Sequence, residues 1–141
     1  VVVEETQVVE GCGVWSIYPD GFVQVPNGQL VLAKTRIRCR IAPTRPRAFE
    51  GELFDAGRVG EKILLRHWQP GDRFQPIGME QPVKLQDLFT NAKVPAAEKR
   101  QRVLACTETG DIFWVQGLRI GEIAKTQPHT ARFLGWICGK S

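Results

Sequence analysis

The chain is short of nucleophiles and metal ligands. It holds two serines and two histidines among 141 residues, and its four cysteines are widely scattered. Two serines are too few to favour a Ser/His/Asp catalytic triad, and no local sequence signature indicates a catalytic Cys/His pair. No two cysteines or histidines have the sequence spacing of a structural zinc site. A Gly-x-x-x-x-Gly-Lys loop for nucleotide phosphate is also missing. We therefore predict no catalytic residue, no metal site and no cofactor site in this chain.

Long apolar runs are missing as well. Nothing approaches the roughly 20 apolar residues that span a bilayer, and the first residues lack the pattern of a signal peptide. The cysteines, too distant for a Cys-x-x-Cys pair, are expected to be reduced and buried. These features favour a soluble, cytoplasmic protein with no membrane partner. Since the sequence does not begin with Met, we expect a piece of a longer protein.

Positive charge is concentrated in the second part of the sequence. Residues 1–55 carry six Lys/Arg against seven Asp/Glu, whereas residues 56–141 carry thirteen against eight. The overall formal charge is +4. A cationic excess of this kind suits a polyanionic partner.

The patterns predict an α+β fold that is mainly β, a sandwich-like or mixed β-sheet unit with two short helices. Apolar residues at i, i+3, i+4 and i+7 place one helix at 83–92, and a second begins after Pro95 and reaches residue 102. Residues 57–60 are expected to form a loop. Short β-branched and aromatic runs between turn residues predict strands at 1–3, 14–18, 22–25, from 30 onward, and at 52–55, 62–68, 103–106, 112–116, 118–123 and 133–138.

A proline-interrupted connector at 42–47 divides the chain into a β-meander lobe, residues 1–47, and a second domain, residues 48–141. Just before the connector, residues 34–41 alternate strictly between basic and mostly apolar side chains, as a strand with one exposed face does. The basic face suits either contact with successive phosphates or a solvated edge strand. Its members are Lys34, Arg36, Arg38 and Arg40.

The segment 64–79 combines cations, aromatics and one carboxylate at a predicted turn. In one interpretation Asp72 pins the turn through backbone amides or through Arg66 or Arg73. In the other, the two arginines contact phosphate and Trp68 stacks on a base. The residues assigned to the structural corner are Pro70, Gly71, Asp72, Phe74 and Gly78.

Segments 66–79, 84–89, 93–95 and 112–120, together with Arg100, resemble in order and spacing the C-terminal domain of bacterial tRNA(Ile)-lysidine synthetase. The match covers roughly residues 54–120. Where that family often has a basic residue after the proline, this chain has Ala96, and the charge comes from the next turn. The resemblance implies a β-rich, sandwich-like fold shared with a domain of the phenylalanyl-tRNA synthetase β-subunit.

For the full-length enzyme the resemblance implies a ligase that uses ATP to join lysine to the wobble cytidine of isoleucine tRNA, which changes codon and amino-acid specificity. ATP and Mg²⁺ would bind an N-terminal PP-loop catalytic domain with a Ser-Gly-Gly-x-Asp-Ser loop, which is absent from this chain. The implied partners are the isoleucine tRNA and that catalytic domain, and a homodimer stays open.

We interpret this chain as the part that recognises tRNA, mainly through electrostatic contacts. One alternative is a structural module that packs on a catalytic domain or a second subunit, and another is an accessory domain of a tRNA synthetase β-subunit. The candidate nucleic-acid contacts are Arg36, Arg38, Arg40, Arg66, Arg73, Lys84, Lys93, Lys99, Arg100, Arg102 and Arg119.

Overall fold

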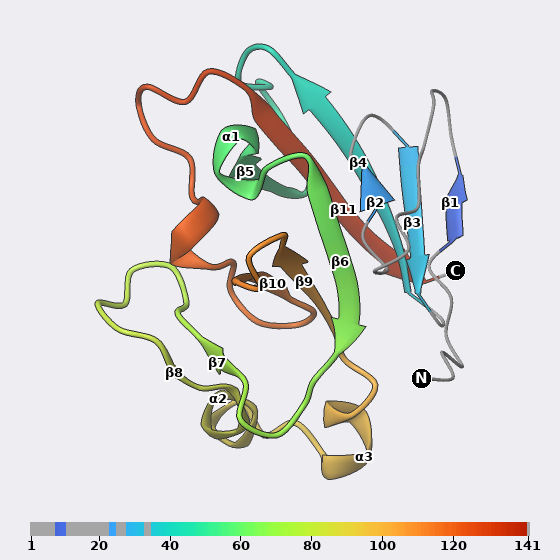
Figure 1. Ribbon diagram of the computed structural model, residues 1–141, viewed down its shortest axis with the longest axis vertical. Helices are drawn as coiled ribbons and strands as arrows, with labels where there is room; N and C mark the ends of the chain where they lie inside the picture. Colours follow the sequence, from blue (N-terminus) through green and yellow to red (C-terminus); the bar gives the residue numbers. More distant parts are fainter. Residues whose placement is uncertain (1–7, 11–22, 25–27, 33–34, 141) are drawn as a thin grey trace.

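The computed structural model describes residues 8–10, 23–24, 28–32 and 35–140 (Figure 1). The strands expected at 1–3 and 14–18, and Lys34 of the basic face, lie outside these residues. Within them every strand ladder is antiparallel, and two sheets face each other. The chain is therefore mainly β and sandwich-like, as predicted.

The first sheet has five strands in the order β1-β3-β4-β11-β5. β11 lies between β4 and β5 and pairs with both. The proposed domain boundary at residue 47 falls in the loop between β4 and β5, and it stays a prediction. The strands are β1 Val8–Glu10, β3 Gly28–Leu32, β4 Thr35–Ala42, β5 Glu52–Asp55 and β11 Phe133–Lys140.

The second sheet has four strands in the order β10-β9-β6-β2, and its centre is buried on both faces. Because side chains alternate across a strand, Val103 and Ala105 of β9 face the first sheet, whereas Leu104 and Cys106 face the other way. This sheet is thus the middle layer of the molecule. Its strands are β2 Val23–Gln24, β6 Lys62–His67, β9 Val103–Thr107 and β10 Ile112–Val115.

An aromatic cluster fills the core between the two sheets. The rings of Phe54 and Phe113 meet edge to face with centroids 5.0 Å apart, and Trp136 packs against them at 5.8 and 5.4 Å. All three side chains are almost fully buried. Edge-to-face pairs are the preferred geometry for aromatic rings, so this cluster fixes the spacing of the two sheets.

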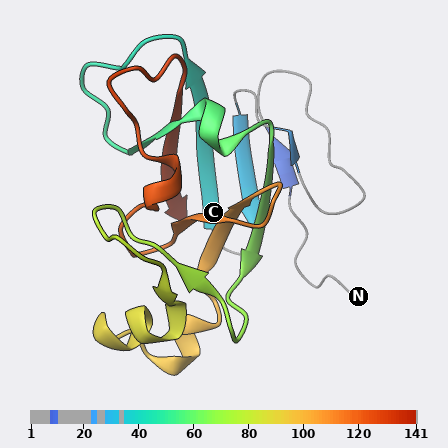
Figure 2. The same cartoon turned by 60° about the vertical axis from the view of Figure 1, so that its left-hand side comes forward.

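A second core covers the other face of the middle layer. It is built from Phe74, Leu85 and Phe89, each at most 1% exposed. In Figure 1 and Figure 2 the two predicted helices lie at this end of the molecule, and the 43–50 loop lies at the opposite end. The elements around this core are β7 Arg73–Phe74, β8 Val83–Lys84, α2 Leu85–Asn91 and α3 Ala96–Lys99.

Three local predictions were wrong. The loop expected at 57–60 is a helical turn, α1 Ala56–Val59, because the Asp55 carboxylate accepts hydrogen bonds from its first amides, as a helix N-cap does. The strand expected at 118–123 is instead a turn at Gly117, with φ +84°, followed by the 3₁₀ turn η1 Glu122–Ala124. The second predicted helix ends at Lys99, not at residue 102.

Candidate nucleic-acid interface

Arg66 and Asp72 close the predicted corner. Nη1 and Nη2 of Arg66 donate to the two carboxylate oxygens of Asp72, each at 2.9 Å. The backbone N–H of Gln69 donates to the same carboxylate at 2.8 Å, and Arg66 also donates to the carbonyl of His67. Gly71 takes φ +94° inside the turn, a conformation that glycine adopts without strain. The corner is therefore pinned from both sides.

The ion pair with Asp72 engages the guanidinium of Arg66 within the protein. The side chains of Arg66 and Asp72 are 23% and 12% exposed. The hydrogen bonds that Arg66 donates to Asp72 raise the pKa of Arg66, against the opposing effect of burial. The geometry agrees with the pinned-turn interpretation and selects Arg66, not Arg73, as the partner of the carboxylate. Phosphate contact by Arg66 stays a prediction.

The β7–β8 ladder holds two cations directly opposite each other. Arg73 pairs in register with Lys84, and both side chains are exposed. On the other face of the ladder Phe74 enters the second core with 1% exposure. Arg73 donates to the carbonyl of Pro82 at 3.2 Å, which keeps its guanidinium on the surface side. Because the two cations are neighbours, they concentrate positive charge beside the corner. Like charges directly opposite one another also destabilise a ladder.

Lys99 of α3 adds to the charge at this end. Its ammonium lies 5.2 Å from the centroid of the Trp68 ring, within the range of a cation–π contact. Trp68 is half-buried, and its ring packs against the second core. One face of the Trp68 ring is thus covered by the Lys99 ammonium.

The side chain of Arg102 makes its contacts within the protein. It donates to the carbonyl of Gln116 at 3.0 Å and pairs with Glu98 at 3.5 Å. A Cβ at Gly117 would clash with Nη1 of Arg102, so the guanidinium fills the space that this glycine leaves. Three further predicted contacts are exposed, and these are Lys93, Arg100 and Arg119.

The segment 75–79 is fastened to the chain after β10. The N–H of Ile77 donates to the carbonyl of Ile120 at 2.8 Å, and the N–H of Gly78 donates to the Glu122 carboxylate at 2.9 Å. Gly78 has φ +87°. Hydrogen bonds from Lys125 and from Gly78 lower the pKa of Glu122. The sequence indicated a break at Gly78 but gave no sign of this carboxylate partner.

The basic strand is β4, and its alternation is as predicted. Ile37 and Cys39 are buried in the first core, whereas Arg38 and Arg40 are exposed and Arg36 is half-buried. Across the ladder these arginines lie opposite residues of β11, with Arg40 opposite a glycine. The outer face of the five-stranded sheet therefore carries the arginine row.

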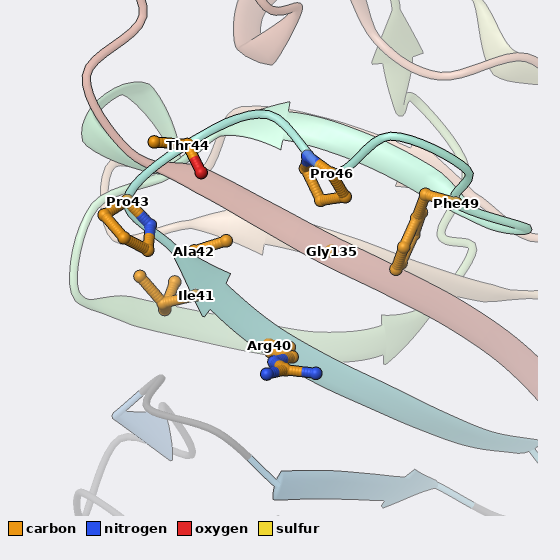
Figure 3. A pocket seen from close by; sticks show the side chains of 8 residues that line it. All are labelled: Arg40, Ile41, Ala42, Pro43, Thr44, Pro46, Phe49 and Gly135. Carbon is orange, nitrogen blue, oxygen red and sulfur yellow. The ribbon is translucent and has the colours of Figure 1, made fainter.

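A groove of about 360 Å³ lies at the end of this row. Its floor is β11 at Gly135, and its sides are Arg40 and the loop that carries Pro46 and Phe49 (Figure 3). The sequence reasoning missed both Phe49 and Gly135. The available signal was a glycine inside a strand, which often marks a place where another group approaches the backbone.

The two serines lie outside the described residues, and Nδ1 of His67 is within hydrogen-bond distance of the Arg102 carbonyl, at 3.1 Å. Within residues 8–10, 23–24, 28–32 and 35–140, no three His, Cys, Asp or Glu side chains are placed to hold a metal ion. The same residues include no helix that is long and apolar enough to cross a membrane.

The fold and the site first define a class: a small antiparallel β domain with a cationic surface around a rigid turn. The family follows from comparison with known sequences. Residues 63–136, just over half of the chain, match the family described as the TilS substrate C-terminal domain. The chain belongs to this family, as the sequence motifs indicated.

Several relatives are similar over the same region. The tRNA(Ile)-lysidine synthase of Clostridium acetobutylicum is 40% identical over 83 residues, which are 59% of this chain and 18% of that protein. The enzyme of the same name from Bacteroides thetaiotaomicron is 38% identical over 90 residues, 63% of this chain and 21% of that protein. The chain thus spans about a fifth of the length of these curated relatives.

Two solved structures have a similar fold. The crystal structure of a TilS C-terminal domain superposes with a TM-score of 0.64 at 21% identity, covering 96% of this chain and 98% of that one. An N-terminal fragment of the phenylalanyl-tRNA synthetase β-subunit from Pyrococcus horikoshii gives 0.51 at 12% identity, covering 72% and 28%. At these identities the likeness shows the fold alone, and it agrees with the predicted architecture.

Proposed function

We propose that this chain is the tRNA-recognition part of a tRNA(Ile)-lysidine synthase. Family membership supports the enzyme, and one observation carries the role: the exposed cations Arg73 and Lys84 lie directly opposite each other on a rigid hairpin. Such a pair is unfavourable by itself and becomes favourable when an anion bridges it. A phosphate of the RNA backbone supplies that charge.

Recognition in this proposal is mostly electrostatic and follows the shape of the RNA. Between residues 64 and 102, seven Lys/Arg stand against four Asp/Glu, and one of those acids is already paired with Arg66. The remaining cations lie on the β7–β8 hairpin, on turns and at helix ends around the second core, where a curved backbone can reach them. The strongest candidates are the exposed ones, which are Arg73, Lys84, Lys93, Arg100 and Arg119.

The complete enzyme would be an ATP-dependent ligase of the cytoplasm that joins lysine to the wobble cytidine of isoleucine tRNA. The described residues include no group of three His, Cys, Asp or Glu side chains that could hold Mg²⁺, and we derive no chemical step from them. We assign that chemistry to the catalytic domain. The residues of this chain would hold the tRNA in position for it.

The test is a titration of the chain with isoleucine tRNA at increasing salt. We expect binding at low salt and a linear fall of log K with log salt, at a slope that reports the number of phosphates contacted. Absence of binding at low salt, or an affinity that does not change with salt, would contradict the proposal.

A second candidate is a packing module that docks on the catalytic domain or on a second copy. The observation in its favour is that Met79 and Ile123, at 39% and 37% exposure the large exposed hydrophobics of the described chain, lie on segments tied together by the Gly78–Glu122 hydrogen bond. Sedimentation of the chain and of a Met79→Asp variant distinguishes the two: a dimer that the substitution dissolves favours packing.

A further inference from the structure

The 43–50 loop crosses the outer face of the five-stranded sheet and encloses the groove beside Arg40. In Figure 3 Pro46 and Phe49 stand along the loop, Gly135 lies on the strand below it, and Arg40 lies on the neighbouring strand. The 43–50 loop lies at the end of the molecule opposite α2 and α3 (Figure 1), and no residue that lines the groove is a buried member of either core. The groove is therefore a site of its own.

Two glycines seat the aromatic ring of this groove. A Cβ at Gly135 would lie 2.8 Å from Cζ of Phe49, and a Cβ at Gly51 would lie 2.8 Å from Cε2 of the same ring. These glycines belong to separate parts of the chain, and only their lack of side chains lets the ring reach the sheet. Phe49 is half-buried by this seat, so it presents a fixed aromatic surface to the groove.

Positive charge borders the ring. Arg40 lines the groove, and Arg38 follows it on the same face of β4 at the roughly 6.6 Å spacing of alternate strand residues. Neither arginine is paired with a carboxylate in the described part of the chain. Arg45, by contrast, is held by the Phe133 ring and by Thr126. The groove thus combines one seated ring with two available guanidinium groups.

We propose that one unpaired RNA nucleotide occupies this groove, with its base against Phe49 and its phosphate on Arg40, and with the next phosphate on Arg38. The volume of about 360 Å³ lies at the small end of the usual range for ligand sites, about 300–1,000 Å³, as a single nucleotide requires. Aromatic stacking beside a basic track is how proteins bind single strands. The inference rests on the proposed function, because it assumes that the chain meets RNA.

The experiment uses the 141-residue chain, a five-nucleotide uridine RNA, a blunt RNA duplex and isoleucine tRNA. We expect Phe49→Leu to weaken binding of the single strand roughly tenfold, within the range of one lost stack, and Phe49→Tyr to retain it. Arg40→Gln should lower the salt slope for the single strand by about 0.7. Arg73→Ala is the matched control: it should weaken tRNA binding and leave the five-nucleotide RNA unaffected. Thermal unfolding verifies that each variant is folded.

The outcomes separate this inference from the proposed function. If the wild-type chain binds tRNA but not the single strand, or if Phe49→Leu and Arg40→Gln bind the single strand as the wild type does, the inference is overturned and the proposed function stands. If the wild-type chain binds neither tRNA nor duplex, the proposed function fails. A protein partner whose binding Phe49→Leu abolishes, without any single-strand affinity, would make the groove a protein-docking site and would also overturn the inference.

Discussion

At the scale of single residues, Asp72 does the most to define the corner. It receives two hydrogen bonds from Arg66 and one from the amide of Gln69, and its own carbonyl accepts the N–H of Leu85, the first residue of α2. Through its carboxylate Asp72 joins β6 to the turn, and through its backbone carbonyl it holds the start of α2. Arg66 in turn depends on the Asp72 carboxylate, because a half-buried guanidinium needs an anionic partner.

Replacing Asp72 by Ala should destabilise the chain by about 2–4 kcal/mol, because the half-buried guanidinium of Arg66 loses its partner. Urea unfolding measures the loss. Glu80→Ala is the control, an exposed carboxylate whose removal should change the free energy of unfolding by less than about 0.5 kcal/mol. Equal losses in the two variants would show that Asp72 does not pin the corner.

Cys39 makes stability depend on alkaline pH. Burial raises the pKa of its thiol from 9.0 to about 12. Between these values the unfolded chain releases the proton and the folded chain keeps it, so stability falls as pH rises above about 9. From pH 8 to pH 10 the wild type should lose about 1.4 kcal/mol more than Cys39→Ala, measured by urea unfolding under reducing conditions. The same loss in both proteins would rule out this linkage.

At the scale of elements, the β7–β8 hairpin presents charge on one face and anchors itself through Phe74 on the other. Its position is set by the corner before it and by α2 after it. Because the charged side chains and the Phe74 anchor lie on opposite faces, a charge can be removed without disturbing the anchor.

Arg73→Ala should therefore weaken tRNA binding and lower the salt slope by about one phosphate contact, with little change in the free energy of unfolding. Removal of one member of a like-charged pair can even stabilise the hairpin slightly. Arg58→Ala, an exposed arginine on α1, is the matched control and should bind tRNA as the wild type does. A large loss of stability in Arg73→Ala would assign the residue to the scaffold.

The elements also show what the sequence could predict. The alternation of β4 and the helical spacing of α2 follow from local patterns, and both elements were predicted from these patterns. Local pattern could not choose between Arg66 and Arg73 as the partner of Asp72, because the choice depends on which face of β6 meets the second core. The seat of Phe49 needs glycines 51 and 135 side by side, and that proximity exists only after β11 has paired with β5.

At the scale of the whole molecule, the middle sheet couples two cores. Leu104 of β9 packs in the second core and Val103 beside it packs in the first, so neither core can loosen without disturbing the same strand. The corner and the arginine row therefore belong to one packed unit in the described chain.

Unfolding should accordingly be one cooperative transition. Leu85→Ala in the second core and Leu134→Ala in the first should each cost about 2–5 kcal/mol and should each lower the midpoint seen by probes of both cores. Fluorescence of variants that keep only Trp68 or only Trp136 provides the two probes. Separate midpoints for them would mean that the cores unfold independently.

The position of β11 has a consequence for synthesis on the ribosome. This strand lies between β4 and β5, yet it follows both of them in the sequence by a long interval. Until residues 133–140 have emerged, the facing edges of β4 and β5 lack their hydrogen-bond partner, and Phe54 lacks the Trp136 ring that packs against it. Pairing over such a separation is slow, and unpaired strand edges attract other chains. The nascent domain thus depends on late completion, and its arginine row becomes a fixed surface only when translation of this segment is finished.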